Sequence, residues 1–561
     1  MKKIRHRWIL RFVILLILVA GCSKKSSWQD PPADLPEHTL VYGGDFTLSR
    51  SLNESLFVPA LRKDILKDVS GLFKNADIAL VNGEGVISQG GYFFDKGEPR
   101  PYMYRAHPLA IEPLKDAGID IINVGNNHFG DYGPEAMKEM LDRLQAAGIN
   151  YTGGGYNIKD AKQPSYYKAG DVTVAVIGGD FTLAAPFKAG LNKPGTNYYN
   201  AFRTDKFEDG IVNDLTKIYN EARKHAHIVI LSPHWGDNWL TEPAPEIKKL
   251  ARRLIKIGFD GIIGHSAHLY QGVELIDGKP VIYDAGNLVS DFSPADNSRF
   301  AIAWKLTFTK AGITKAEGFP LLLRKNKTMY ASGKNADFVL EDLAKKSTRM
   351  KTPLTITNNS AVLNCNPGKM FIPIDTENIP KRNKSTTIRL APDDTVISHL
   401  PRSATPCNVE FEGGIKMTGF ELLIKDISTP KGAQVFITYW QTDKKTDGNY
   451  QIYQEARQIT SSGVEGARNA SMHIPGDWLF PVNKWEPGKT IRDWTLFRLT
   501  FNPVGEVNFY VSLTKDGKKL APLKSDKPVV NSNLIFLGKG KYSKDAKRVF
   551  YYLNQYRQHS H

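Results

Sequence analysis

The sequence predicts an α/β domain followed by an all-β domain. Residues 39–325 alternate short apolar runs with amphipathic stretches, which is the pattern of strands and helices in an α/β domain. Beyond about residue 370 the helical periodicity fades, and short strand-like runs recur with turn residues between them, as in a β-sandwich or jelly roll. The chain has 561 residues, 41% of them hydrophobic, which is enough for more than one buried core.

The first domain is expected to span residues 39–330. Two amphipathic stretches, 134–148 and 244–258, begin near a proline and end on a glycine, which are helix start and stop signals. Residues 272–287 predict an antiparallel hairpin around an Asp-Gly turn. The remaining apolar runs are the expected strands: 39–44, 76–82, 120–125, 172–179, 227–233 and 259–265.

The second domain is expected at residues 370–545, after a linker (331–369) that contains one helix at 336–347. Its tryptophans, among them Trp478 and Trp494, are expected to fill a core rather than to stack on sugars, because tryptophan buries a large area. A basic, aromatic tail covers residues 546–561. The expected strands of this domain are 419–427, 433–442, 495–503, 506–520 and 533–540.

The N-terminus predicts export from the cytoplasm. Residues 1–21 have a basic start, an apolar run and a small residue before Cys22, which is the pattern of a secretory signal peptide. "LVAGC" resembles the bacterial lipobox, in which the cysteine carries lipid after cleavage. Residues 22–38 would then be the lipidated Cys22 and a polar, Pro-rich tether. We expect a protein outside the cytoplasm, lipid-anchored to a bacterial membrane; an uncleaved membrane anchor is the alternative, although the apolar run is short for a span.

The net charge restricts the possible partners, and the cysteine content restricts the possible disulfides. A net charge of +16 suits nucleic acid, anionic lipid or an acidic polymer. No nucleic-acid-binding motif accompanies the charge, so we expect no nucleic-acid partner. Apart from Cys22, only Cys365 and Cys407 remain, an even pair that an oxidising compartment would allow to form a disulfide; two buried free thiols are the alternative.

Polar side chains follow the expected strands, where open α/β sheets bind ligands. A single such residue is usually a helix cap, a turn residue or a structural histidine. Several consecutive strand ends with carboxylates and imidazoles instead predict a site for Zn, Mn or Fe, and their number suits two metal ions, as in phosphate-ester hydrolysis. The residues are Asp45, Asn82, Glu84, Asn126, Asn127, His128, Asp131, His234, Trp235, Asp237, His265, His268, Gln271, Asp284 and Asn287.

The motifs "GGD", "VNGEG", "GNNHFGDYG", "TGGGYN", "SPHWG", "GHSAHLYQG" and "YDAGN" occur in this order between residues 39 and 325. In this respect the chain resembles the capsule synthesis protein CapA family, which takes part in poly-γ-glutamate biosynthesis and is related to calcineurin-like metallophosphoesterases. The resemblance implies a metallophosphoesterase-like α/β sandwich over residues 39–330. It also implies an anionic polymer as partner, together with synthetase or export subunits.

The resemblance assigns roles to the polar residues. Asp45 and His268 would bind a first metal ion, and Asn127, His234 and His265 would bind a second. Glu84 would bridge the two ions. His128 would be the general acid or oxyanion stabiliser, oriented by Asp131. The residues assigned to the substrate-binding rim are Asn126, Trp235, Gln271 and Asn287.

Two departures from the metallophosphoesterase pattern bear on the metal count. Phe46 and Thr47 follow Asp45 where Asp-x-His is usual, and His265 and His268 form His-x-x-His, with Ala267 between them. The first metal site therefore lacks one imidazole. We expect a metal-dependent, hydrolase-like protein of capsule-polymer biosynthesis or export. The alternatives are a non-catalytic polymer- or polysaccharide-binding lipoprotein and a periplasmic metallophosphodiesterase unrelated to capsule.

Overall fold

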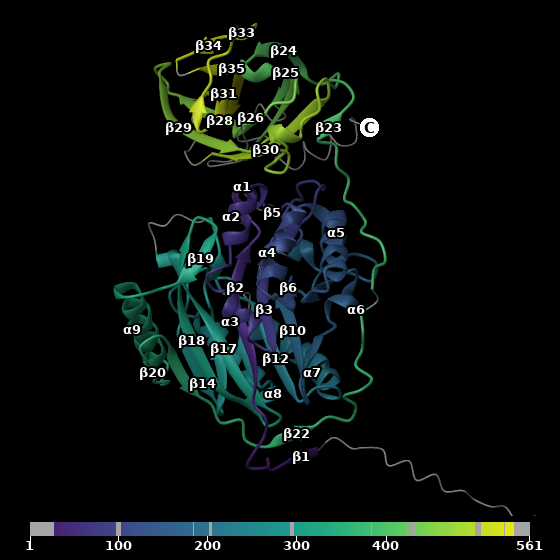
Figure 1. The fold of residues 1–561 in the computed structure, drawn as a ribbon, viewed down its shortest axis with the longest axis vertical. Helices are drawn as coiled ribbons and strands as arrows, with labels where there is room; N and C mark the ends of the chain where they lie inside the picture. The colour runs from purple at the N-terminus through teal and green to yellow at the C-terminus, as the bar shows by residue number, and fades with distance from the viewer. Residues whose placement is uncertain are drawn as a thin grey trace, which may run out of the picture.

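The structure is a computed structural model that describes residues 27–96, 102–182, 185–200, 205–291, 297–382, 384–422, 426–427, 433–499, 506–531 and 533–542. The predicted signal peptide, Cys22 and the tail at 546–561 lie outside these ranges. An α/β domain lies below a β domain, and a long connection runs along one side of the α/β domain (Figure 1).

Two mixed sheets face each other in the α/β domain. One sheet is built around the parallel strands β2, β3, β6 and β7, and the other around β10, β12, β13 and β15. In order, the first sheet comprises β20 (Thr355–Ile356), β21 (Ala361–Asn364), β18 (Gly312–Arg324), β17 (Phe300–Thr309), β2 (His38–Thr47), β3 (Ile78–Glu84), β6 (Ile121–Asn123) and β7 (Asn150–Thr152), with β16 (Asn287–Val289) beside β2 and β19 (Lys327–Tyr330) beside β18. The second comprises β14 (Val273–Ile276), β15 (Lys279–Ile282), β13 (Gly261–Ile263), β12 (Ile228–His234), β10 (Val172–Asp180) and β9 (Ser165–Ala169).

The sheets form a sandwich because alternate side chains of their strands point inward. Tyr42 and Leu80 meet Val174 and Ile230 in the core between the sheets. The opposite faces of the same strands pack on helices, with α5 on the first sheet and α7 and α8 on the second. The helices are α1 (Leu52–Phe57), α2 (Pro59–Asp64), α3 (Ser70–Lys74), α4 (Ile111–Asp116), α5 (Gly133–Ala146), α6 (Ile158–Ala161), α7 (Asp205–Arg223), α8 (Pro245–Ile257) and α9 (Lys334–Arg349).

The C-terminal domain is a sandwich of two antiparallel-rich sheets. Trp440 and Trp485 are fully buried in its core, and Trp478 and Trp494 are only partly buried. The first sheet comprises β23 (Val396–Ile397), β30 (Thr490–Arg498), β27 (Ala433–Thr442), β25 (Ile415–Leu422), β24 (Thr405–Glu410) and β33 (Lys524–Ser525). The second comprises β26 (Asp426–Ile427), β35 (Leu534–Tyr542), β31 (Glu506–Lys515), β28 (Tyr450–Ile459) and β29 (Glu465–His473), with β32 (Lys518–Lys519) beside β31 and β34 (Val529–Val530) beside β35. The predicted fold class, an α/β sandwich followed by a β-sandwich, is confirmed.

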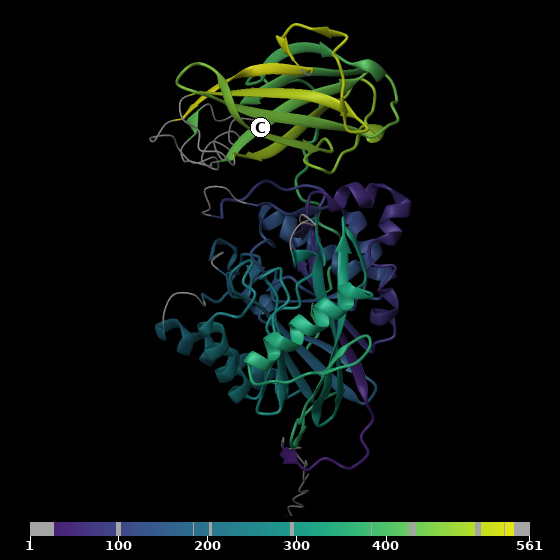
Figure 2. The ribbon, with the colours of Figure 1, turned by 90° about the vertical axis from the view of Figure 1, so that its left-hand side faces the viewer.

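Three short strand pairs complete the α/β part: β4 (Val86–Ile87) with β5 (Arg105–Ala106), β8 (Gly154–Gly155) with β11 (Gly195–Thr196), and β1 (Ser27–Gln29) with β22 (Met370–Ile372). The last pair lies at the base of the α/β domain, away from the β domain (Figures 1 and 2). Part of the segment expected as a tether is therefore a strand in this structure.

The connection between the domains is fastened to the α/β domain. Arg389 forms a two-pronged ion pair with Asp142 of α5, and the backbone N–H of Ala391 donates to Glu139 (2.9 Å). The backbone N–H of Gly91 donates to Pro392 O at 2.9 Å. The β domain is thus connected through ordered contacts to helix α5.

The predicted disulfide is wrong. Cys365 and Cys407 are free thiols, because Cys365 follows β21 of the α/β domain whereas Cys407 lies in β24 of the β domain. Burial raises the pKa of each thiol to about 12. Within the described residues, no helix has both the length and the apolar character needed to cross a membrane.

Candidate metal centre

Asp45 lies at the centre of two groups of potential metal ligands. One group consists of Asp45, His234 and His265, and the other of Asp45, Glu84 and His268; within each group the ligand atoms lie within 4.8 Å of one another. All five side chains are buried. They come from the carboxyl ends of β2, β3 and β12 and from the loop after β13, so the two facing sheets each supply part of the site.

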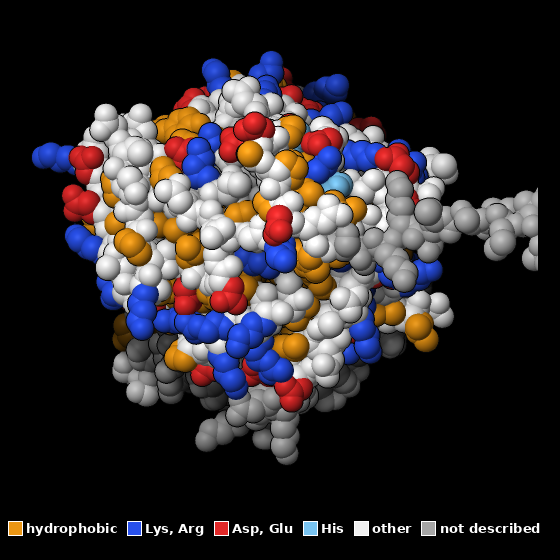
Figure 3. Space-filling view, turned by 90° about the horizontal axis from the view of Figure 1, so that it is seen from below, with side chains coloured by type: hydrophobic (Ala, Val, Ile, Leu, Met, Phe, Trp, Pro, Cys, Tyr) orange, Lys and Arg blue, Asp and Glu red, His pale blue; other side chains and the backbone are white. Residues whose placement is uncertain are grey.

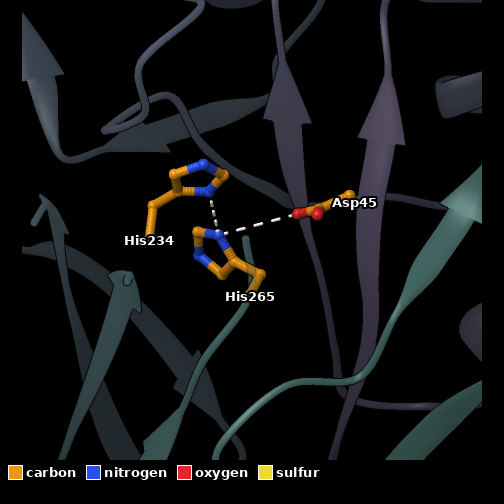
Figure 4. Close-up of side chains that lie close together, drawn as sticks. All are labelled: Asp45, His234 and His265. Carbon is orange, nitrogen blue, oxygen red and sulfur yellow. Dashed lines mark hydrogen bonds and ion pairs between the residues drawn. The ribbon is translucent and has the colours of Figure 1, made fainter. Parts of the chain in front are cut away.

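Neighbouring ligand atoms of the two groups lie 2.7–3.7 Å apart. His265 Nδ1 lies 3.6 Å from Asp45 Oδ1, and His234 Nδ1 lies 2.7 Å from His265 Nδ1 (Figure 4). His268 Nδ1 lies 3.5 Å from Asp45 Oδ2, and His268 Nε2 lies 3.7 Å from Glu84 Oε1. In both groups the imidazole and carboxylate atoms therefore approach each other without forming a short hydrogen bond.

The chemistry of these residues fits a bound cation. The buried Asp45 Oδ2 has no hydrogen-bond partner among the described residues, although buried polar atoms are normally paired. Burial raises the pKa of Glu84 to about 7 and raises that of Asp284 well above its usual range. Burial alone would lower the pKa of His268, but the charges of Glu84 and Asp45 raise it to about 9. Without a metal ion, a protonated His268 is the balancing charge beside the two carboxylates.

Backbone geometry explains the second glycine of the motif "GGD", residues 43–45. Gly44 has φ +80°, and a Cβ on it would lie 2.2 Å from Gly286 O. Only glycine allows this close approach, which lets the N–H of Asp45 donate to Gly286 O at 3.1 Å. The loop after β13 is also unusual, since Ser266 (φ 121°) and His268 (φ 61°) both adopt positive φ. Such strain in a non-glycine residue is typical of functional sites.

Carboxamides fix the imidazoles and carboxylates. Asn82 Nδ2 donates to Asp45 Oδ1 (2.8 Å), and Asn123 Nδ2 contacts His265 Nε2 (2.9 Å). Asn127 Oδ1 lies 2.9 Å from His234 Nε2, whereas Asn126 donates to Gly83 O (2.9 Å) and so shapes the loop. These contacts orient the candidate ligands in the way that outer partners of metal sites do.

His128 lies beside the second ligand group. Its Nε2 lies 3.9 Å from Glu84 Oε1, and its Nδ1 lies 2.7 Å from Asp131 Oδ2. The ring stacks on Tyr104 with centroids 4.0 Å apart. Lys96 is buried against the same pair, with Nζ 2.9 Å from Asp131 Oδ1 and 3.1 Å from His128 Nδ1. Burial, helped by the charge of Lys96, lowers the pKa of His128 well below its usual range.

The other predicted residues divide into two sets. Asn287 is brought close to the centre, because β16 pairs with β2 opposite Asp45 and Asn287 Oδ1 lies 3.1 Å from His268 Nδ1. Trp235 is instead a core residue that donates to Tyr283 O (2.9 Å), and Gln271 donates to Leu240 O (2.9 Å). The assignment of individual ligands and substrate contacts remains a prediction.

Three features differ from the sequence-based reasoning or escaped it. Asp45, rather than Glu84, is the carboxylate common to both ligand groups. Lys96 and Tyr104 flank His128 but lie in a stretch without a recognisable motif. Thr47, at the position of the missing imidazole, donates to Glu84 Oε2 at 3.2 Å.

Fold and site together define an α/β sandwich with a carboxylate–imidazole centre where the strands of its two sheets end. Residues 39–292, which form most of the α/β domain, match the family model described as bacterial capsule synthesis protein PGA_cap.

Two curated relatives and one solved structure illustrate the comparison. The "Capsule biosynthesis protein CapA" of Bacillus anthracis is 26% identical over 295 residues, covering 52% of this chain and 69% of the relative. The "PGA biosynthesis protein CapA" of Bacillus subtilis strain 168 is 30% identical over 229 residues, covering 40% of this chain and 57% of the relative. The NAD nucleotidase of Haemophilus influenzae is 14% identical, with a TM-score of 0.29 over 58% of this chain and 65% of that one. A score this low supports no inference about chemistry.

Proposed function

We propose that this chain is a lipid-anchored protein outside the cytoplasm that serves the synthesis or export of an anionic capsule polymer of the poly-γ-glutamate type. In this proposal it has a metal-dependent, hydrolase-like site and works with synthetase or export subunits. The observation that carries the proposal is the pair of buried ligand groups that share Asp45. The names of the relatives, which refer to capsule and PGA biosynthesis, and the net charge of +16 support an acidic polymer as partner.

The arrangement of the domains is compatible with an anchor at the base. Strand β1 begins five residues after Cys22 and pairs with β22 there, while the β domain lies at the opposite end. Seen from below, the base carries clusters of lysine and arginine side chains (Figure 3). Such a surface would favour an anionic membrane and would leave the metal centre facing away from it.

Asp45, Glu84 and His268 would hold one divalent ion, and Asp45, His234 and His265 another, while Asn127 fixes the ring of His234 through Nε2. Zn, Mn or Fe suits these donors, and such ions activate water and stabilise charge on an attacked carbonyl or phosphoryl oxygen. His128 would exchange a proton with the reacting group through Nε2, while Asp131 holds the ring through Nδ1. Burial of the whole cluster excludes bulk water.

Metal content of the purified full chain, measured by mass spectrometry without chelators, tests the proposal. We expect about two ions per chain in the wild type, none in Asp45→Ala and a loss of about one in Glu84→Ala. His128→Ala should keep its metal but lose hydrolysis of γ-glutamyl peptides or phosphodiesters, because a proton-transfer group is not a ligand. Asp180→Asn is the matched control, since Asp180 is a buried carboxylate at the end of β10 outside both groups. Unchanged metal in Asp45→Ala would refute the assignment.

A non-catalytic polymer-binding role is the second candidate. It is favoured by one observation: Thr47, not histidine, contacts Glu84, so the group with Glu84 contains a single imidazole. This candidate predicts one metal ion or none, polymer binding, and no turnover. Turnover of small phosphodiesters without an effect on polymer would instead indicate a phosphodiesterase unrelated to capsule.

A further inference from the structure

A pocket lies between the two domains. It is lined by Arg50 and Tyr132 of the α/β domain and by Ser471, Asp477, Trp478 and Thr495 of the β domain, and its cavity volume is about 20 Å³. A volume of this size holds one or two water-sized groups, which is the size of a carboxylate rather than of a sugar ring. The pocket therefore suits one charged end group of a larger molecule.

The β-domain wall of the pocket is a turn held in an uncommon conformation. Asp477 (φ 51°) and Trp478 (φ 72°) are consecutive non-glycine residues with positive φ. A buried carboxylate, Asp493, accepts from the N–H of Gly476 (2.8 Å) and lies 3.0 Å from His473 Nε2. Backbone strain that is maintained by a buried network is typical of functional positions.

Among the described residues that line the pocket, Arg50 is a cation without a charged partner. Asp477 Oδ2 accepts from Arg105 (2.7 Å) and from the hydroxyl of Tyr132 (2.7 Å), so its charge is neutralised within the interface. The half-buried Arg50 has no hydrogen bond or ion pair from its guanidinium to any residue that the structure describes. An unpaired arginine that lines a pocket can bind a carboxylate or phosphate through its guanidinium.

Two lining residues of the pocket lie close in sequence to residues of the metal centre. Arg50 comes five residues after Asp45, just beyond the end of β2. Tyr132, on the opposite side, is adjacent in sequence to Asp131, which holds His128. The segments that carry Asp45 and Asp131 thus also supply part of the α/β wall of the pocket.

We propose that this pocket is a substrate subsite built by both domains, in which Arg50 binds one carboxylate of an acidic polymer and Trp478 packs on the aliphatic part of the same unit. The proposal rests on the proposed function, because it takes the acidic polymer as the ligand. It gives the β domain a role in selecting the substrate.

Binding of γ-linked hexaglutamate to the purified full chain, measured by calorimetry, tests the subsite. We expect Arg50→Gln to bind about tenfold or more weakly, since a hydrogen bond to a charged group is lost. Arg50→Lys should be intermediate because it keeps the charge but loses the forked geometry. Trp478→Ala should also weaken binding. Arg402→Gln and Trp28→Ala, which change exposed residues of the same types elsewhere, should bind as the wild type does.

Metal content, measured on the same samples, separates the two proposals. Unchanged metal content with weakened oligomer binding in Arg50→Gln supports the subsite. If the purified wild type contains no metal but binds the oligomer in a way that depends on Arg50, the subsite is supported and the hydrolase proposal fails. Equal binding in Arg50→Gln and Arg402→Gln overturns the subsite. Loss of metal in Arg50→Gln, or a metal-loaded wild type that does not bind the oligomer, overturns it as well.

Discussion

Replacement of Asp477 by alanine should weaken the contact between the two domains. Asp477 and Arg105 form a buried ion pair at 2.7 Å, with side chains only 8% and 7% exposed. The guanidinium of Arg105 also stacks over the ring of Tyr132, 4.0 Å from its centroid, and its Nε already has no hydrogen-bond partner among the described residues. The alanine variant would leave a buried cation unpaired.

The expected cost follows from that environment. Removal of one partner of a buried pair typically costs about 3–5 kcal/mol, because the remaining charge is desolvated without compensation. Asp477→Asn should cost less, about 1.5–3 kcal/mol, since it keeps an acceptor for Tyr132 and loses only the charge-assisted part. The double variant Arg105→Met with Asp477→Leu should recover much of the loss, because neither charge is then buried alone.

Denaturant unfolding of the full chain, followed by tryptophan fluorescence, measures these differences. Trp478 and Trp494 line the interdomain pockets, so separation of the domains should change their emission. Asp443→Ala is the control, since its ion pair with Lys416 is 58% exposed on the carboxylate side and should contribute at most about 1 kcal/mol. If Asp477→Ala were no less stable than Asp443→Ala, the pair would not hold the domains together.

Three further predictions concern the α/β domain. Burial alone would raise the pKa of Asp142, but hydrogen bonds from Arg389 and Tyr156 lower it to about 2. The stabilisation that results is complete above about pH 4 and is lost as the pH falls towards 2. The unfolding midpoint of Asp142→Asn should therefore fall less between pH 7 and pH 3 than that of the wild type. Gly44→Ala should displace Asp45 and reduce metal content, with Gly71→Ala, where a Cβ meets no atom within 4 Å, as the control. Lys96→Met should leave the buried Asp131 without its cation and cost about 3 kcal/mol in thermal unfolding, whereas Lys67→Met, on the surface, should cost little.

Much of the centre could be predicted from the sequence because its ligands follow apolar strands in short motifs. Glu84 and His234 each end a buried strand, and Asp45 lies two residues before the end of another; parallel strands of one sheet bring such ends to one edge. The sequence also places His265 and His268 three residues apart in one loop. What joins them is the face-to-face packing of the two sheets, and periodicity does not specify which strand ends meet across that interface.

Other features could not be predicted because they depend on contacts between distant segments. Lys96 reaches Asp131 from a loop with no periodic pattern, and Asp477 reaches Tyr132 from 345 residues further along the chain. The disulfide prediction failed for the same reason, since an even number of cysteines carries no information about the domains in which they lie.

The position of Asp45 explains how a centre lacking the usual second imidazole can still be organised. The side chain of Asp45 reaches ligands from both sheets: Oδ1 faces His265 at 3.6 Å and Oδ2 faces His268 at 3.5 Å. Thr47, which replaces the imidazole, instead donates to Glu84 and fixes that carboxylate. A single carboxylate with one oxygen for each group makes the two sites interdependent. Loss of Asp45 should therefore empty both, whereas loss of Glu84 should leave the group of His234 and His265 intact, and the number of ions that remain in the two variants separates this arrangement from one bridged by Glu84.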